Sequence, residues 1–314
     1  MMNLNLLKLR IVELLEKYNK ITTVAEILEL KQPTVTFHMK NMERDFGVKL
    51  FDARMGKFIL TDAGYALHHY AVKINALAAE AQRAVTEFDT LRKGNLRIGA
   101  SYVPATYVLP TVLHRFSQEY PGIHISLSVK TAPVVRDMLE RHEIDLGIIS
   151  TVPFASPELK VETICEDDLV LILSPKHPLA SVTEPTSERI VSSSFVLHGT
   201  ESSTRWLTEK WLQSNQLRLP SYLEFDSLEA IKQAVMLGEH VSFVSRMAVQ
   251  AEVERGLLEI RPIPGNLGKR HVYAVTNKDR HWSALLNKFT EQLSLYPIEL
   301  QQQSLFMNKG TSLF

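Results

Sequence analysis

The 314-residue chain has one cysteine, no long apolar run and no net charge. A lone Cys165 cannot form an internal disulfide. Without a signal peptide or an apolar run of about 20 residues, the sequence predicts a cytoplasmic protein that does not cross a membrane. Because 35 basic residues balance 35 acidic ones, affinity for nucleic acid requires a local basic patch.

Sequence signatures of catalysis and of nucleotide binding are also missing. The chain has no Gly-x-Ser-x-Gly nucleophile motif, phosphate-binding loop or dinucleotide fingerprint. His68 and His69 are neighbours on a predicted helix and point apart, so they cannot clasp one metal ion. Asp167-Asp168 is interpreted as surface charge and Cys165 as a buried structural thiol. We therefore expect no enzyme activity, no metal and no cofactor.

The first 30 residues predict two helices. Apolar residues recur at three- and four-residue steps from Leu4 to Tyr18, which is typical of an amphipathic helix. Thr23 stands three residues before Glu26, a capping-box pattern that predicts the start of a second, short helix.

A third helix is predicted from Gln32 to Phe46, because Pro33 is tolerated in a first turn and Gly47 suits a C-terminal cap. Its apolar residues share one stripe, which leaves polar residues on the other faces. Two helices joined by a tight turn are typical of a helix–turn–helix that presents its second helix to a DNA groove. The residues expected to reach bases or phosphates are Gln32, Thr34, Thr36, Phe37, His38 and Lys40.

A basic hairpin should follow this helix. Residues 48–51 and 58–60 read as two short strands around a turn at 52–57. Residues 31–57 contain six basic and three acidic residues, a local excess that suits contact with phosphates. Arg54 and Lys57, at the tip, are expected to contact the DNA backbone or the minor groove.

The next segment predicts a long helix that pairs with a second copy of the chain. Thr61 can cap it, and no glycine or proline occurs between Tyr65 and Leu91. Apolar residues then alternate steps of four and three, the spacing of a coiled-coil seam. The alternative is that the helix packs on its own C-terminal domain. The predicted seam comprises Leu67, Ala71, Ile74, Ala78, Ala81, Val85 and Phe88.

From residue 96 onward, strands and helices alternate, which favours an α/β domain. The predicted strands are 96–99, 123–129, 146–149, 169–173, 241–244 and 272–275. The predicted helices are 109–119, 134–141, 204–215 and 228–237.

Hydroxyl side chains gather in the loops after predicted strands, where open α/β sheets bind ligands. Residues 200–205 also precede a helix, whose N-terminal N–H groups could hold an anion. Taken one by one, such hydroxyls are better explained as helix caps or turn residues, so the prediction depends on their convergence. The residues predicted to bind a small anionic effector are Ser101, Tyr102, Thr151, Thr200, Ser202, Ser203, Thr204 and Ser245.

With these segments in order, the chain resembles the LysR-type transcriptional regulator family to about residue 297. In the N-terminal part the matching residues are Thr22, Ala25, Glu26, Leu28, Gln32–Thr36, Met42-Glu43, Phe46–Val48, Leu50-Phe51 and Leu60–Gly64. In the C-terminal part they are Leu96–Gly99, Leu109-Pro110, Phe116, Tyr120-Pro121, Asp145–Gly147, His177–Leu179 and Val235–Gly238.

The resemblance implies an α/β protein with a winged helix–turn–helix domain (1–60), a dimerising linker helix (61–92) and a two-lobed effector domain (93–300). The effector domain would be similar to type 2 periplasmic binding proteins. Lobe I would comprise residues 93–164 and 270–300, and lobe II residues 165–269, with crossings near Ile164 and Arg270. Residues 301–314 are expected to form a disordered tail.

The same resemblance implies the partners. Gln32, Pro33, Thr34, Thr36 and the next two residues should face double-stranded DNA. An effector should bind between the lobes, and closure of the lobes should alter the geometry of a homo-oligomer, at least a dimer and commonly a tetramer.

Several positions depart from the usual family pattern, among them Gly238-Glu239-His240-Val241 in place of a common Gly-Leu-Gly-Ile. Lys31 stands where a serine usually caps the recognition helix, and Phe37 where an arginine is frequent. Ala53 occupies a wing position that is often arginine. Phe37 could touch a thymine methyl group but cannot make the bidentate guanine contact of arginine, so no base preference is transferred.

Two other functions remain alternatives to a ligand-responsive DNA-binding regulator. One is a small-molecule-binding protein whose N-terminal domain only dimerises it. The other is an enzyme of the α/β domain, for which no nucleophile and base can be named.

Overall fold

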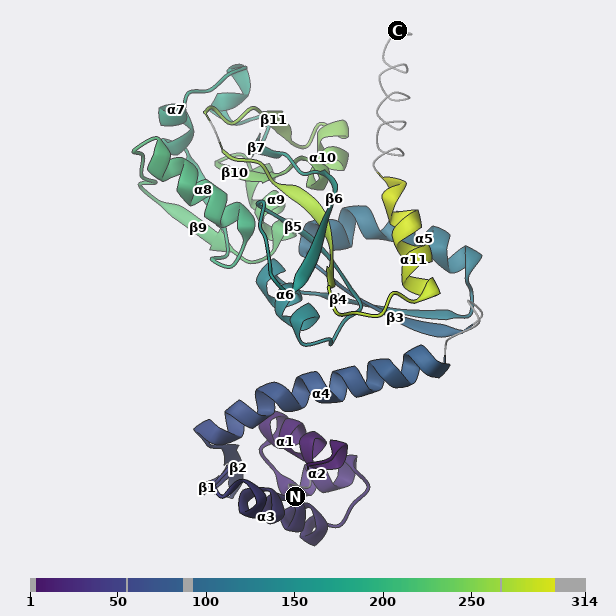
Figure 1. The fold of residues 1–314 in the computed structure, drawn as a ribbon. Coiled ribbons are helices and arrows are strands. Elements are labelled where there is room, and N and C mark those ends of the chain that lie inside the picture. Colours follow the sequence, from purple (N-terminus) through teal and green to yellow (C-terminus); the bar gives the residue numbers. More distant parts are fainter. Residues whose placement is uncertain (1–3, 55, 87–92, 266, 297–314) are drawn as a thin grey trace. The chain divides into compact units, whose positions relative to one another are not determined.

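The computed structural model of the chain describes residues 4–54, 56–86, 93–265 and 267–296 (Figure 1). Its internal contacts fall into two units, an N-terminal one that ends with a long helix and a C-terminal one. Phe88 of the predicted seam and the predicted tail at 301–314 lie outside the described residues. No helix in the described ranges has the length and apolar character needed to cross a membrane.

Three helices form the first part of the N-terminal unit: α1 (Leu6–Tyr18), α2 (Ile21–Ile27) and α3 (Gln32–Phe46). The predicted bounds of α3 are confirmed, and Gly47 ends it in the left-handed conformation with φ 70°. The capping-box prediction is wrong. Thr23 and Glu26 lie inside α2, which begins after Lys20 without a side-chain cap because burial of Val24 and Ala25 fixes it instead.

A hairpin of β1 (Phe51–Arg54) and β2 (Lys57–Leu60) follows α3. The first strand begins three residues later than predicted. Glu43, near the end of α3, accepts hydrogen bonds through its Oε1 from the backbone N–H groups of Leu50 and Phe51, at 2.9 and 3.1 Å. This carboxylate fixes the base of the hairpin to α3.

The long helix α4 (Asp62–Thr86) begins at the predicted cap, because Thr61 Oγ1 accepts the N–H of Gly64 at 3.1 Å. It packs on α1, and Ala71 is fully buried in the hydrophobic core of this unit with Leu67 against it. Prediction of Ala71 as a contact to a second copy is therefore wrong. The exposed apolar stripe of α4 comprises Tyr70, Ile74, Leu77, Ala81 and Val85.

The C-terminal unit contains two five-stranded sheets, and we call each sheet with its helices a lobe. In the lobe I sheet the strand order is β4-β3-β5-β12-β6. Strands β3, β4 and β5 are parallel, whereas β12 runs antiparallel to its neighbours. Their bounds are β3 Gly94–Ala100, β4 Ile123–Val129, β5 Leu146–Thr151, β6 Leu159–Glu166 and β12 His271–Asn277.

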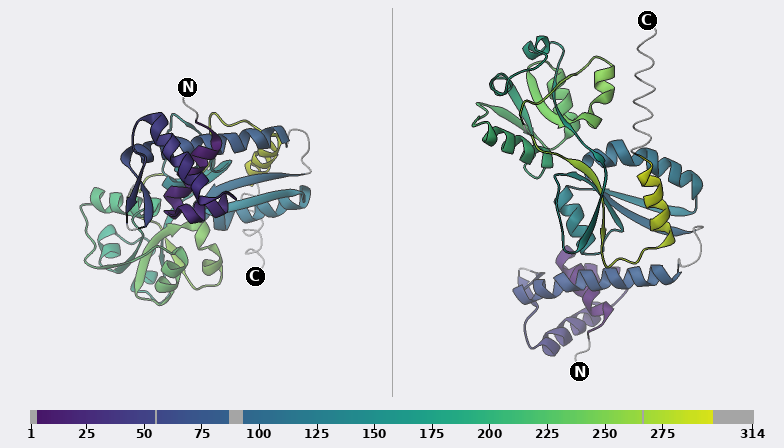
Figure 2. Two further views of the ribbon diagram at one scale, coloured as in Figure 1. Left: turned by 90° about the horizontal axis from the view of Figure 1, so that it is seen from below. Right: turned by 45° about the horizontal axis from the view of Figure 1, so that its top comes forward.

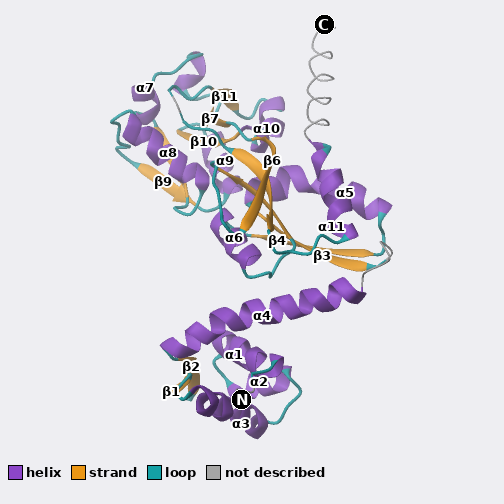
Figure 3. Ribbon diagram, in the orientation of Figure 1, coloured by secondary structure: helices purple, strands orange, loops and turns teal. Residues whose placement is uncertain are grey.

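Helices cover both faces of the lobe I sheet (Figure 3). On one face α5 (Leu109–Glu119) and α11 (Ala284–Ser294) pack around Phe116 and Phe289. On the other face lies α6 (Ala132–Glu140). A π-helical turn, η1 (Pro104–Val108), leads into α5.

The lobe II sheet has the order β11-β7-β10-β8-β9 and is likewise buried on both faces. Helix α9 (Leu228–Met236) covers one face, and α7 (Ser187–Val191) and α8 (Ser203–Ser214) cover the other. The remaining short helices are η2 (Pro178–Ser181), η3 (Arg246–Ala248) and α10 (Gln250–Glu254). The strand bounds are β7 Leu169–Leu173, β8 Ser194–His198, β9 Tyr222–Phe225, β10 His240–Ser245 and β11 Glu259–Arg261.

The chain passes between the lobes twice, as Figure 2 shows for this unit. The first passage is at Asp167-Asp168, between β6 and β7, because Ile164 still belongs to β6. The second ends at Arg270, immediately before β12. The α/β fold class is confirmed, and the first crossing lies three residues beyond the predicted one.

Candidate functional site

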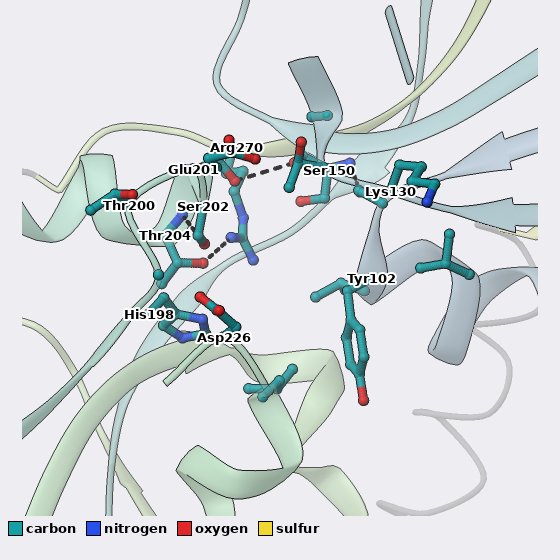
Figure 4. A pocket seen from close by; sticks show the side chains of 18 residues that line it. Tyr102, Lys130, Ser150, His198, Thr200, Glu201, Ser202, Thr204, Asp226 and Arg270 are labelled. Atoms are coloured by element: carbon teal, nitrogen blue, oxygen red, sulfur yellow. Dashed lines mark hydrogen bonds between the residues drawn. The ribbon is translucent and has the colours of Figure 1, made fainter. Parts of the chain in front are cut away.

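A cavity of about 600 Å³ lies between the two lobes of the C-terminal unit (Figure 4). Six of the eight predicted effector residues line it: Ser101, Tyr102, Thr200, Ser202, Ser203 and Thr204. The structure therefore brings together loops from both lobes that sequence analysis had selected separately.

The other two predicted residues are not among those that line the cavity. Thr151 is the last residue of β5, where it pairs with His271 of β12. Ser245 is 2% exposed, and its hydroxyl donates to a carboxylate behind the cavity. Both residues were predicted because ligands bind at the carboxyl ends of strands in open α/β sheets. This rule places them near the site but does not give the direction of their side chains.

Helix N-termini from both lobes meet at this cavity. A helical turn begins at Tyr102, α6 begins after Thr131, and α8 begins after Ser202. All three positions line the cavity, as does Leu228 at the start of α9. Because the first N–H groups of a helix lack partners within it, such termini favour an anion.

A buried ion pair between the two crossovers lies beside the cavity. Asp167 is fully buried and Arg270 is 4% exposed, with Nη2 2.8 Å from Asp167 Oδ2. The backbone N–H of Asp167 also donates to the Arg270 carbonyl at 3.0 Å. Prediction of Asp167 as surface charge is therefore wrong.

The Asp167 carboxylate also binds one hydroxyl from each lobe. Ser150 of β5 donates to Oδ2, and Ser245 of β10 donates to Oδ1 at 2.5 Å. Ser150 is in turn connected to both sides of the cavity, because its N–H donates to Ser101 Oγ at 2.8 Å and its carbonyl accepts from Ser203 Oγ at 3.2 Å. The crossovers and the cavity wall thus form one hydrogen-bonded network.

The Arg270 guanidinium is incompletely bonded for a buried cation. Nη1 donates to Thr204 Oγ1 at 2.6 Å. Within the described ranges neither Nε nor Nη2 makes an aligned hydrogen bond, although Nη2 has its charge contact with Asp167. Figure 4 places this guanidinium beside Thr204, with Tyr102 and Lys130 on the opposite side of the view.

His198, at the end of β8, is held neutral in the cavity wall. Burial, together with the positive charge of Arg270, lowers its pKa to about 4. Its Nε2–H donates to the Phe243 carbonyl at 3.1 Å, which leaves Nδ1 as a hydrogen-bond acceptor. The histidine therefore adds no charge to the site at neutral pH.

Besides Arg270, three charged side chains line the cavity without having been predicted. Lys130 comes from lobe I, and Glu201 and Asp226 come from lobe II. Lys130 follows Val129, the predicted end of β4, so the same strand-end rule could have found it. Asp226 follows β9, an exposed edge strand whose sequence has no alternating pattern and was not predicted.

Cys165 lies in β6 and is half-buried. Burial raises the pKa of its thiol to about 12, and the negative charge of Asp167 acts in the same direction. The thiol is therefore protonated and unreactive at neutral pH. The described residues contain no cluster of three or more His, Cys, Asp or Glu side chains that could hold a metal ion.

Helix α3 of the N-terminal unit exposes most of its residues that were predicted to contact DNA. Val35, Met39 and Met42 are buried and anchor α3 to the core. Thr34, Thr36 and His38 are half-buried beside the exposed face. The exposed residues are Gln32, Pro33, Phe37 and Lys40 on α3, and Arg54 and Lys57 on the hairpin.

Phe37 is 60% exposed, a large apolar ring in the middle of a polar helix face. Its ring makes an edge contact with His38, 5.9 Å between centroids. Nothing in the core of this unit requires a phenylalanine there, so its surface is available to a partner.

The pKa of His198 predicts a specific loss of stability in acid. The unfolded chain takes up a proton near pH 6.5 and the folded protein near pH 4, so stability is full above pH 6.5 and is lost as pH falls toward 4. Between pH 7 and 4.5 this group should contribute a loss of about 2 kcal/mol. His198→Gln, which retains a donor for Phe243 but does not titrate, should lose that much less in urea unfolding followed by tryptophan fluorescence. Equal losses in the two proteins would contradict this assignment.

Both units match families of known proteins. Residues 6–65 match the family described as bacterial regulatory helix-turn-helix protein, lysR family. Residues 89–295 match the LysR substrate binding domain. A probable RuBisCO transcriptional regulator of Synechocystis sp. is 32% identical over 97% of this chain and 91% of its own length.

Solved structures share the fold. The regulatory domain of Synechocystis CcmR, solved in complex with 2-PG, is 28% identical and aligns with a TM-score of 0.59 over 64% of this chain and 96% of that domain. Full-length CbnR complexed with its target DNA aligns with a TM-score of 0.64 over 92% of this chain and 99% of that one, at 21% identity. On the family matches and the similarity to the Synechocystis regulator, the chain belongs to the LysR family of DNA-binding transcriptional regulators.

Proposed function

We propose that a small anion bound in the cavity between the lobes is the effector of this regulator. The observation that carries the proposal is the meeting of helix N-termini with the hydroxyls of Ser101, Ser202 and Ser203 around one cavity. These groups donate hydrogen bonds or complete helix caps, which suits an oxyanion. The 2-PG complex of the CcmR regulatory domain supports the same class of ligand.

We propose that α3 enters the major groove of double-stranded DNA. Gln32, Pro33, Thr34, Thr36, Phe37, His38 and Lys40 would lie along the bases and the adjacent phosphates. Phe37 would contact a thymine methyl group, since its ring has no polar atom. Arg54 and Lys57 would bind the backbone beside the hairpin, which makes their contribution one of affinity rather than of sequence choice.

The exposed stripe of α4 supports a homodimer. Tyr70, Ile74, Leu77, Ala81 and Val85 recur at three- and four-residue steps and leave a narrow apolar surface with no cover in this unit. Two copies would place two recognition helices on one DNA site with two-fold symmetry. Pairing of dimers into a tetramer would give effector binding a route to the spacing of these helices.

We propose that the protein acts in the cytoplasm and is not an enzyme, and that its domains have separate roles. Residues 1–60 read DNA, residues 61–92 dimerise the chain, and residues 93–300 bind the effector, with the lobes divided near Asp167 and Arg270. A ligand that binds one arrangement of the lobes with higher affinity than the other would shift the protein between two DNA-binding states.

Removal of single positive charges should test the DNA-binding surface. Lys40→Ala and Arg54→Ala should each weaken binding to a duplex and reduce the slope of log K against log salt by about 1, because each releases one fewer counterion. Fluorescence anisotropy at several salt concentrations measures both quantities. Lys288→Ala, on α11, is the control and should change neither. Unchanged binding in the first two variants would favour a merely dimerising N-terminal domain.

A screen of ligands should test the anion class. At a concentration about 100 times its Kd, an effector adds about 2.7 kcal/mol to stability. We therefore expect 2-PG, inorganic phosphate or a small organic acid to raise the thermal midpoint by about 5 °C or more, and neutral sugars of similar size to leave it unchanged. A shift with neutral ligands alone would overturn the anion class.

A charge in the exposed stripe of α4 should dissociate the dimer. Leu77→Glu would place two carboxylates in an apolar seam, and sedimentation equilibrium should then show dissociation at concentrations at least about tenfold higher than for the wild-type protein. Ala79→Glu, exposed on another face of α4, should leave the association constant unchanged. A dimer that tolerates Leu77→Glu would rule out this seam.

A further inference from the structure

The guanidinium of Arg270 in the C-terminal unit is a buried cation with few hydrogen bonds. It is almost fully buried and carries a positive charge, yet among the residues that the structure describes it makes one aligned side-chain hydrogen bond, from Nη1 to Thr204. Buried arginines ordinarily satisfy their five donors, since each unpaired donor costs the loss of its hydration. Arg270 also lines the cavity, but Nε and Nη2 are themselves closed off from solvent, so a ligand there can supply the missing acceptors only when the lobes shift.

Its counterion, the Asp167 carboxylate, has partners besides Arg270. Asp167 accepts hydroxyls from Ser150 of lobe I and Ser245 of lobe II and has its charge contact with Arg270. Asp167 does not line the cavity and belongs to one crossover, whereas Arg270 belongs to the other. One carboxylate therefore joins both lobes and both crossovers, and the cation in contact with it, Arg270, lines the effector cavity.

We propose that Arg270 is the receptor for the anionic group of the effector and that Asp167 is the positioning residue that conveys its binding to the two crossovers. This inference rests on the proposed function, because it assumes an anion in this cavity. An oxyanion on Nε and Nη2 would compete with Asp167 for the guanidinium. The carboxylate that holds Ser150 and Ser245 would then lose part of its compensation, and the lobes would settle at a different separation.

This arrangement predicts that a substitution at Asp167 raises the affinity for an anion. Removing its negative charge leaves the guanidinium uncompensated, so an anion in the cavity should bind more tightly. A residue that only stabilised the fold should, when replaced, weaken binding or leave it unchanged, with no gain that is specific to anions. The direction of the change therefore separates the two roles.

Calorimetric titration of the full-length protein with 2-PG and with inorganic phosphate tests the proposal. Asp167→Asn should bind the probe at least about fivefold more tightly than the wild-type protein, because the competing charge is gone. The double variant Arg270→Gln/Asp167→Asn leaves no unpaired buried charge, so it should fold, and it should bind at least about 30-fold more weakly.

Two controls separate this pair from general electrostatics. Lys130→Gln removes an exposed positive charge at the same cavity and should reduce affinity less than about threefold, because solvent screens it. Lys288→Ala removes an exposed positive charge on α11, outside the cavity lining, and should leave affinity within about twofold.

Hydrogen exchange gives a second readout, of coupling rather than affinity. In the wild-type protein the probe should change exchange in peptides that cover residues 167–173 and 262–273. In Asp167→Asn the probe should bind without that change. If Asp167→Asn fails to fold, the double variant and Lys130→Gln still decide whether Arg270 is the receptor.

The outcomes are distinct. Wild-type protein that binds neither probe would overturn both the anion class and this inference. Wild-type protein that binds a probe no better than the double variant would overturn the inference and leave the proposed function standing. Weaker binding by a folded Asp167→Asn protein would assign Arg270 and Asp167 a structural role and overturn the coupling.

Discussion

The buried contact between Asp167 and Arg270 fixes how the two lobes of the effector domain are joined. Each residue stands at one passage of the chain between the lobes, and each is almost completely withdrawn from water. Removing two charges from water is costly, and the aligned hydrogen bonds that the pair makes offset only part of this desolvation cost. Apolar side chains would stabilise this core as well as the ion pair does. The position of the pair beside a cavity therefore indicates a role in ligand binding rather than in folding stability.

The other features of the site follow from that constraint. His198 is kept neutral by burial and by the nearby guanidinium, so the positive charge of the cavity wall comes from Arg270 and Lys130. Ser150 links the carboxylate to Ser101 and Ser203, which places helix N-termini of both lobes around the same space. Cys165, two residues before Asp167, is protonated at neutral pH, so thiol chemistry has no part in this mechanism.

Much of the fold could be predicted from the sequence where periodicity and turn chemistry agree. Pro33 and Gly47 fixed both ends of α3, and the apolar runs of β4 and β7 gave those strands their observed bounds. The edge strands β9 and β11 were missed because an exposed or very short strand has no alternating pattern to detect. The capping box at Thr23 failed because burial of neighbouring residues decided where α2 begins.

The site was predictable in part for a similar reason. Hydroxyls after strands led to six lining residues, because the carboxyl ends of strands meet at one edge of each sheet. The Asp167–Arg270 pair could not be found this way, since its members are distant in sequence and neither belongs to a motif. The seam on α4 was shifted for a third reason: periodicity gives an apolar face but not which neighbour covers it, and α1 covers Ala71.

The central claim is that an anion at Arg270 changes how the protein binds DNA. The most direct measurement is the affinity for a duplex selected by the protein from a random pool, by fluorescence anisotropy with and without saturating 2-PG. The account predicts a change of at least about fivefold in either direction, as expected for coupled sites, and none in the Arg270→Gln/Asp167→Asn protein. Equal DNA affinity with and without 2-PG, when calorimetry shows that the cavity of the wild-type protein is filled, would contradict it.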